Sequence, residues 1–261
     1  MKACVLVVCL CVTEVIALPS AVFANPNGGH RYHAAELLSK GDPAGASLEL
    51  DARLRKKPND EKAKLLLAAV LVKLSEQSVK SGDRAGAIAL GRQAVALDPD
   101  EAYWHGALAK LLSAQGNTEE ATKECSRAAQ LFPLDSDLAE GCGFQGKPAL
   151  DEDISVQRVV PPGENPAAGP RVHMTPPVPL EKAEPRYSEK ARSVGYQGTT
   201  VLWFVLNAQG EVEKAAIMQP LGLGLDEMAL RTVRTWKFKP ATKEGTPVPV
   251  KVRVEVSFRL F

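Results

Sequence analysis

The sequence predicts a multidomain chain, in which an all-α solenoid of helical repeats is followed by a small α+β domain. Glycines and prolines recur at a spacing of 34 residues in the first half, which is typical of stacked helical hairpins. The last third follows the order helix, hairpin, helix and strand, and a proline-rich stretch separates the two parts. A length of 261 residues is sufficient for two modest domains.

The charge balance disfavours a nucleic-acid-binding protein. The chain has 32 basic and 31 acidic residues, with a formal net charge of +1. Residues 181–261 carry 13 basic and 9 acidic side chains, so this part is mildly basic and slightly favours acidic partner segments. We therefore expect no nucleic-acid partner.

The N-terminus has the pattern of an export signal. A short basic start, Met1-Lys2, precedes an apolar run, and Val22-Phe23-Ala24 is a small-residue cleavage pattern. We expect residues 1–24 to be a signal peptide that is removed, which predicts a periplasmic protein. The alternative is an uncleaved inner-membrane anchor that faces the periplasm. Glu14 opposes this alternative, because a charge at the bilayer centre costs about 2–3 kcal/mol.

Cysteine usage agrees with export. Three of the five cysteines, Cys4, Cys9 and Cys11, lie in the signal segment, so the mature chain keeps only Cys125 and Cys142. Two cysteines 17 residues apart in an exported protein suggest a disulfide. The alternative is that Cys125 is a small buried hydrophobic residue.

Residues 27–142 contain the repeat. Gly82 and Gly116 are 34 residues apart, and so are Pro99 and Pro133. These positions, with small residues where two helices cross, resemble the tetratricopeptide repeat (TPR) family, and an earlier and looser unit precedes them. The resemblance implies helix pairs that bury their apolar faces by stacking on each other.

Two further features of the repeats predict local structure. Asp83 and Asn117 stand where helices begin and have side chains that cap backbone N–H groups. Tyr103 and Trp104 open the last unit, where they either line a peptide-binding groove or serve as core or interface packing.

Residues 151–180 predict a linker. Eight prolines lie between Arg158 and Pro185, and no apolar periodicity survives. Such a composition favours extended polyproline conformation and a semi-rigid spacer.

Residues 181–261 predict the α+β domain. Thr199 to Leu206 is rich in strand-forming residues, Asn207-Ala208-Gln209-Gly210 is a turn, and Glu211 to Ile217 returns. A helical apolar pattern from Leu225 to Trp236 ends before a proline. From Val248 to Leu260 apolar and polar residues alternate, which predicts a strand with one buried and one wet face.

This order of elements resembles the TonB C-terminal domain. The matching residues are Pro185-Arg186-Tyr187, Gly198, Asn207-Ala208-Gln209-Gly210-Glu211-Val212 and Trp236-Lys237-Phe238-Lys239-Pro240. The resemblance implies an antiparallel three-stranded sheet whose last strand lies at the edge. It departs at Ser188, where the family usually has a proline.

The resemblance implies that an outer-membrane TonB-dependent transporter, or another envelope protein, adds a strand to this edge by β-augmentation. It assigns partner-binding roles to Glu184, Pro185, Arg186, Tyr187, Lys251, Arg253, Glu255, Ser257 and Arg259. Edge charges can equally serve to prevent aggregation. The family also engages an ExbB–ExbD motor in the inner membrane, a partner expected here only if the N-terminus is retained. Residues 1–24 hold Glu14 and no histidine, unlike the anchor of a TonB protein.

Two functions remain open at the level of sequence: a TonB-family protein that supports energy-dependent transport, and an envelope scaffold without energy coupling. An enzyme is not expected, because His30, His33, His105 and His173 are scattered and no catalytic set, metal-spaced cluster or phosphate loop is present. We expect no cofactor, no metal site and no small-molecule substrate.

Overall fold

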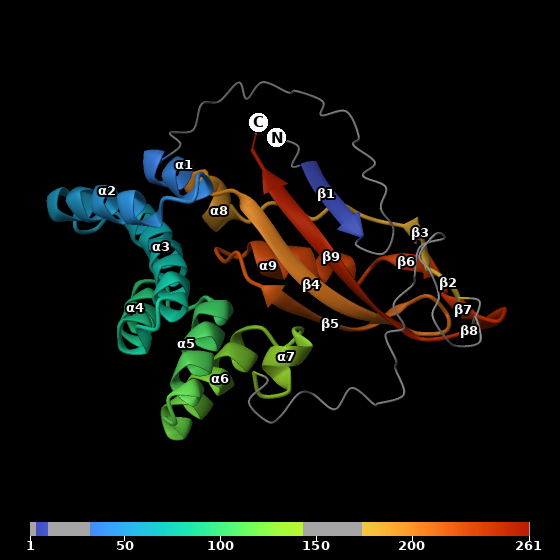
Figure 1. Cartoon of the computed structure of the whole chain (residues 1–261). Coiled ribbons are helices and arrows are strands. Elements are labelled where there is room, and N and C mark those ends of the chain that lie inside the picture. Colours follow the sequence, from blue (N-terminus) through green and yellow to red (C-terminus); the bar gives the residue numbers. More distant parts are fainter. Residues whose placement is uncertain (1–3, 10–31, 143–173, 261) are drawn as a thin grey trace.

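The computed structural model describes residues 4–9, 32–142 and 174–260, and Figure 1 shows their arrangement. The expected cleavage site, most of the signal segment and residues 151–173 of the expected linker lie outside the described residues. No helix within the described ranges is both long enough and apolar enough to span a membrane.

The helical part consists of antiparallel helix pairs closed by a short final helix. The helices are α1 (His33–Ser39), α2 (Pro43–Lys56), α3 (Glu61–Lys80), α4 (Arg84–Leu97), α5 (Ala102–Ala114), α6 (Thr118–Leu131) and α7 (Ser136–Ala139). Gly41, Gly82 and Gly116 end the first helix of their pairs with φ of 81°, 88° and 87°. This left-handed conformation is inexpensive only for glycine, so the 34-residue glycine spacing marks the turn inside each repeat.

Polar caps start several of these helices. The Asp83 carboxylate accepts a hydrogen bond of 2.9 Å from the backbone N–H of Gly86, and Asp42 does the same for Gly45 one repeat earlier. Asn117 stands at the predicted start of α6, but its side chain makes no cap bond. Cys125 of α6 forms a disulfide with Cys142, which ties the segment after α7 to the last repeat.

The C-terminal part is an antiparallel sheet with two short helices. Its elements are β2 (Met174–Thr175), β3 (Val178–Glu181), α8 (Glu189–Val194), β4 (Gly198–Leu206), β5 (Val212–Gln219), α9 (Leu225–Val233), β6 (Lys237–Lys239), β7 (Thr242–Lys243), β8 (Thr246–Pro247) and β9 (Val250–Arg259). The fold class predicted from the sequence, helical repeats followed by an α+β domain, is confirmed.

The main sheet has the order β1-β9-β4-β5, where β1 (Cys4–Cys9) comes from the N-terminus. Three strands therefore belong to the C-terminal part, as the resemblance implied, and β1 adds a fourth beyond β9. The alternation in β9 places Val252, Val254 and Val256 in the core. At the β4–β5 turn, Gly210 has a φ of 82°, and its missing Cβ leaves room for the backbone of Phe238.

The end of the expected linker is folded. β3 pairs with β6, and β2 pairs with β7 in a small sheet, so residues 174–180 belong to the C-terminal part. The prolines led to a predicted linker instead of these strands. Prolines nevertheless fit edge strands, where their missing N–H is not needed.

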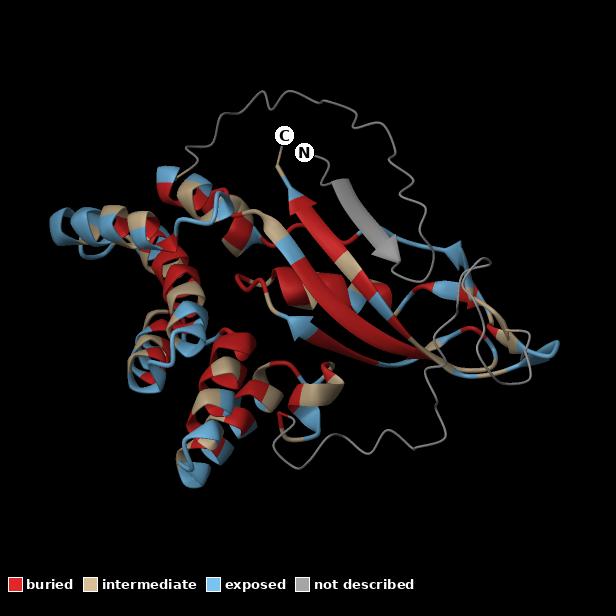
Figure 2. Cartoon of the chain, viewed as in Figure 1, coloured by how far each residue is buried: buried red, intermediate tan, exposed pale blue. Residues whose placement is uncertain are grey.

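The two parts share one hydrophobic core. The cluster that contains Leu66 of α3 and Trp104 of α5 also contains Tyr196, Phe204 and Leu223 of the C-terminal part. In Figure 2 the buried residues include much of α3 and α5 in the helical part and of β4 and α9 in the C-terminal part. The repeats and the sheet are therefore packed against each other rather than merely connected.

Candidate functional site

The outer edge of β9 is the first candidate site. β1 pairs with it antiparallel, in a register from Cys4↔Arg259 to Cys9↔Val254. On the inner side, β9 pairs with β4 along its whole length, from Phe258 to Val250. The β1 residues are those that the sequence assigns to a removable signal peptide, so the backbone groups opposite them are satisfied by an extended segment from outside the domain.

The polar side chains of β9, which alternate with its buried valines, differ from one another in exposure. Arg253 and Arg259 are exposed, while Lys251 and Glu255 are half-buried. Lys251 lies over the Trp203 ring, with its Nζ 3.8 Å from the ring centroid, and burial lowers its pKa. Ser257 is buried and shares a hydrogen bond of 2.8 Å with Thr199 on β4, which corrects its assignment as a partner contact.

The segment that enters α8 also divides into two kinds of residue. Glu184 and Arg186 are exposed, but Pro185 and Tyr187 are buried. Tyr187 donates a hydrogen bond of 2.5 Å to the Tyr196 carbonyl and packs edge-on against Phe258. Pro185 and Tyr187 are thus structural residues, because their side chains are enclosed by their own domain.

Ser188 stands where the TonB C-terminal family usually has a proline, and its hydroxyl makes two hydrogen bonds that a proline could not make. Its hydroxyl accepts a hydrogen bond of 3.1 Å from the Ala191 N–H and donates one of 2.5 Å to the Leu223 carbonyl. Serine therefore caps α8 and also ties it to the loop before α9.

The opposite edge of the sheet, β5, is closed by the repeats. The Ile217 N–H donates to Asp135 at 2.9 Å, and the Ala215 N–H donates to the Ser136 hydroxyl at 3.3 Å. Both acceptors lie at the start of α7. Asp135 also accepts from Tyr103, and burial raises its pKa to about 6. Side chains of the repeats thus occupy hydrogen-bonding groups that a further strand would need.

Tyr103 and Trp104 lie in the contact between the two parts. Both are buried, and Trp104 packs against Gly222, where a Cβ would overlap the indole ring. The structure therefore favours interface packing, one of the two roles expected from the sequence. This face of the repeats is covered by the C-terminal part of the chain itself.

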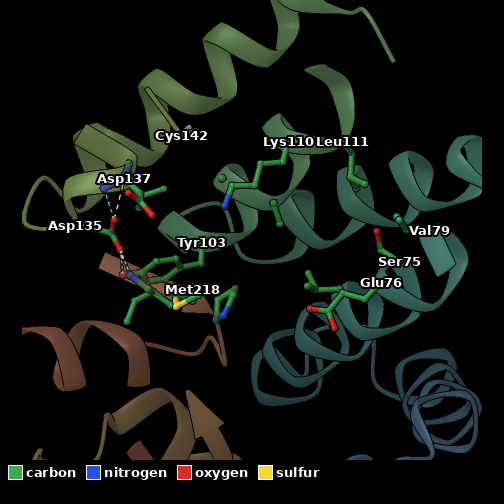
Figure 3. Close-up of a pocket in the computed structure, with 16 residues that line it drawn as sticks. Ser75, Glu76, Val79, Tyr103, Lys110, Leu111, Asp135, Asp137, Cys142 and Met218 are labelled. Carbon is green, nitrogen blue, oxygen red and sulfur yellow. Dashed lines mark hydrogen bonds between the residues drawn. The ribbon is translucent and has the colours of Figure 1, made fainter. Parts of the chain in front are cut away.

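A small cavity of about 220 Å³ remains beside Tyr103, between α3, α5, α7 and β5, and Figure 3 shows its lining. Val79 and Met218, at its mouth, are 42% and 50% exposed. Of its charged lining residues, Lys110 and Glu76 are exposed, whereas Asp137 is half-buried and Asp135 is buried. This cavity could not be predicted from the sequence, because its walls come from both parts of the chain.

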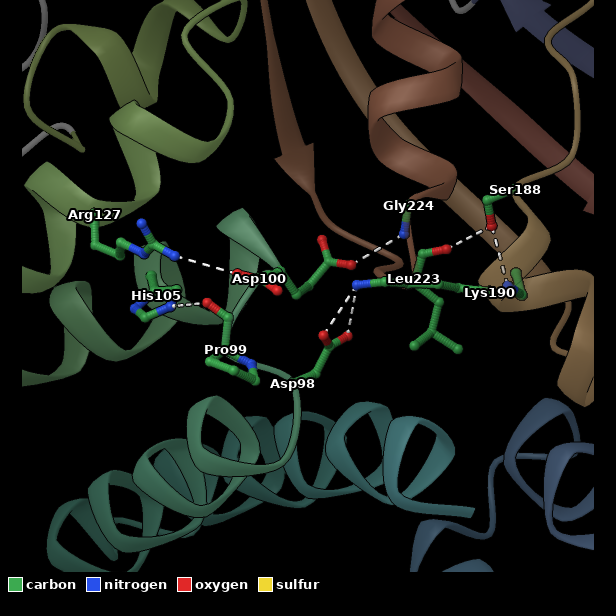
Figure 4. A network of polar contacts seen from close by, with 11 residues as sticks. Asp98, Pro99, Asp100, His105, Arg127, Ser188, Lys190, Leu223 and Gly224 are labelled. Atoms are coloured by element: carbon green, nitrogen blue, oxygen red, sulfur yellow. Dashed lines mark hydrogen bonds and ion pairs between the residues drawn. The ribbon is translucent and has the colours of Figure 1, made fainter. Parts of the chain in front are cut away.

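A polar seam joins the loop before α5 to α8 and α9, as Figure 4 shows. Lys190 of α8 contacts both oxygens of Asp98 at 2.9 and 3.2 Å. Glu101 accepts a hydrogen bond of 3.0 Å from the Gly224 N–H, which begins α9. Two backbone N–H groups, those of Leu221 and Gly222, donate to Asp226.

Burial dominates the electrostatics of this seam. It raises the pKa of Glu101 well above the ordinary value, with Glu227 and Asp226 adding to the effect. Burial and the neighbouring Asp226 raise the pKa of Glu227 to about 7. The pKa of Asp226 is raised by burial as well, although hydrogen bonds to its carboxylate oppose the shift.

No group of three or more metal-ligating side chains is found in the part of the chain that the structure describes. Its histidines are dispersed: His33 contacts Glu49, and His105 contacts Glu124 and the Pro99 carbonyl.

Comparison with known proteins supports this division of the chain. Residues 183–260 match the family model of the Gram-negative bacterial TonB protein C-terminal domain, and residues 78–141 match a tetratricopeptide repeat model. The chain is similar to Protein TonB of Vibrio cholerae serotype O1, with 34% identity over 80 residues. That alignment covers 30% of this chain and 33% of the relative, so the chain spans about a third of the length of the curated protein it matches.

Solved structures match more weakly. A crystal structure of MamA is 15% identical and has a TM-score of 0.29, covering 47% of this chain and 84% of that one. A mutant O-GlcNAc transferase of Thermobaculum terrenum is 30% identical and has a TM-score of 0.31, covering 42% of this chain and 20% of that one. No functional argument follows from similarities of this extent. The family models, by contrast, identify the parts: the chain carries tetratricopeptide repeats followed by a domain of the TonB C-terminal family.

Proposed function

We propose that this protein is a periplasmic, TonB-like envelope protein that captures an extended segment of an outer-membrane transporter or receptor by β-augmentation on β9. The observation that carries the proposal is the pairing of β9 with β1. Six consecutive residues of β1 add to the edge in an unbroken antiparallel register. The same backbone groups supply a partner strand with affinity, and alternate side chains supply its register.

The charges near this edge favour an acidic partner. Arg253 and Arg259 are exposed on β9, and Arg186 is exposed on the segment that enters α8. Glu184 and Glu255 offset part of this positive charge, and Arg253 Nη2 lies 3.7 Å from Glu255 Oε1. A modest positive field accelerates association with an acidic segment more than it increases affinity.

The test is a pull-down from an outer-membrane extract, using the chain recovered from the periplasm, followed by amide exchange. We expect a β-barrel protein to be retained, and its periplasmic segment, added as a peptide, to slow exchange of β9 amides. A variant with Arg253→Glu and Arg259→Glu should bind more slowly, whereas Lys243→Glu, an exposed change on β7, should not. Retention of no barrel protein, or unchanged exchange in β9, contradicts the proposal.

A scaffold without energy coupling is the second candidate, and the packing of the repeats on the sheet favours it. The N-terminal segment decides between them. A mass measurement of the exported protein that places its first residue at Asn25 excludes a direct link to an ExbB–ExbD motor through residues 1–24. An intact N-terminus held in the inner membrane favours energy-dependent transport. In either case the chemistry proposed is binding rather than catalysis.

A further inference from the structure

The seam between the two parts contains a pair of carboxyl groups, one from each part, and each has a buried oxygen. Glu101, in the loop before α5, is 1% exposed. Glu227 lies in the first turn of α9, and both carboxyl groups adjoin Gly224, whose N–H donates to Glu101 Oε2 and whose Cβ position is 3.9 Å from Glu227 Oε2. Glu101 Oε1 and Glu227 Oε2 are both buried, and neither has a hydrogen-bond partner. Two carboxylates only accept hydrogen bonds, so a bond between them requires one proton.

The charges around the pair do not replace that proton. Asp98 and Asp226 face it with further negative charge. Lys190 also faces it, but its ammonium is bonded to both oxygens of Asp98. Lys73, on α3, places a further positive charge near Asp226. With the pair itself included, the site thus holds four carboxyl groups and two half-buried lysines, and an added proton removes part of the excess negative charge.

We propose that a proton shared between Glu101 and Glu227 holds the C-terminal domain on the repeats, so that the domain is released as the pH rises above neutral. The proton completes hydrogen bonding across the seam. Its loss leaves two negative charges in contact in a buried site, and separation of the two parts relieves this by exposing both groups to water.

The direction follows from the pKa values. Docking raises the pKa of Glu227 from its ordinary 4.5 to about 7, and it raises that of Glu101 in the same direction. The contribution of this proton to the free energy of docking is therefore fully present below pH 4.5, and it is lost as the pH rises through about 7. Each further pH unit lowers the docking equilibrium constant by up to about tenfold for one linked proton.

Release changes what the molecule presents. It uncovers Trp104, which docking buries against Gly222. It also removes Asp135 and Ser136 from the N–H groups of Ile217 and Ala215. The β5 edge and the face of the repeats around Trp104 then become available at the same time, whereas β9 is not in this seam.

Small-angle X-ray scattering of the full chain, from about pH 5 to about pH 9, tests the proposal. We expect the radius of gyration to increase above neutral pH, while far-UV circular dichroism shows that helices and strands persist. In Glu227→Gln the amide donates to Glu101 without titrating, so this variant should keep the low-pH radius throughout. The matched control is Glu213→Gln, an exposed change on β5, which should follow the wild type.

Three outcomes overturn the proposal. A wild-type radius that does not change with pH means that the proton does not control docking. Equal release in the wild type and in Glu227→Gln means that another group does. Loss of circular dichroism together with the increase in radius means that the chain unfolds rather than separates.

Discussion

The two edges of one sheet are satisfied in different ways. The outer edge of β9 is paired by the backbone of β1, which imposes a strand register and nothing else. The edge of β5 is capped by the side chains of Asp135 and Ser136, which have fixed positions on the repeats. A backbone partner can be replaced by any extended segment, whereas a side-chain cap accepts only the strand that fits it. The comparison indicates that β9 is the exchangeable edge and β5 the fixed one.

Asp135→Ala should have the largest effect on this contrast. It removes the acceptor for the Tyr103 hydroxyl and for the backbone N–H groups of Ile217 and Leu138. Each buried donor left without a partner costs about 1–3 kcal/mol, so we expect a loss of about 3–5 kcal/mol in the free energy of unfolding. Urea unfolding measures it. Asp135→Asn keeps an oxygen acceptor and should lose less; equal losses would mean that the cap is not what stabilises β5.

Removal of the Cys125–Cys142 disulfide should weaken the β5 edge next. The bond holds Cys142, whose N–H donates to the carbonyl of Asp137 in α7. A loop of this length gives about 3 kcal/mol of stabilisation. Thermal unfolding of Cys142→Ser against the oxidised wild type measures the loss. If exchange of the Ile217 amide does not accelerate in this variant, the disulfide does not support the cap.

Gly222→Ala should cost about 2 kcal/mol and loosen the end of β5. Gly222 has a φ of 89°, and a new Cβ would also overlap Trp104. Gly245→Ala is the matched control, because Gly245 has a φ of 81° and open space around its Cβ position. The difference between the two variants in chemical unfolding isolates the clash with Trp104. No difference would show that Trp104 adapts freely.

Lys251→Ala should have the smallest effect, about 0.5–1 kcal/mol, because it removes a partly exposed cation over the Trp203 ring. Lys251→Arg should retain most of the contact. Urea unfolding gives the stability, and we expect no change in the exchange of β5 amides. A faster-exchanging Ile217 amide in Lys251→Ala would show that the two edges are coupled through Trp203.

Local sequence patterns predicted the helices and strands well. Features that depend on contacts between distant parts of the chain could not be predicted. Glycine spacing predicted the repeats, and the alternation ending at Leu260 predicted β9, since both are periodic features of backbone geometry. The same alternation placed Ser257 on the wet face, but its burial depends on Thr199, 58 residues away. Tyr187, which belongs to the Pro185-Arg186-Tyr187 match, packs against Phe258 within its own domain. The seam could not be predicted, because Glu101 and Glu227 meet only when two separate folds dock.

The position of α7 in the chain has a consequence for assembly. A polypeptide that emerges N-terminus first presents Cys125, Asp135 and Cys142 before any residue of the C-terminal sheet. The last repeat and its disulfide can therefore be complete while β5 is still being delivered. β5 then folds against a last repeat in which the hydrogen-bond acceptors Asp135 and Ser136 are already in position. α7 therefore influences the order of folding as well as the final structure.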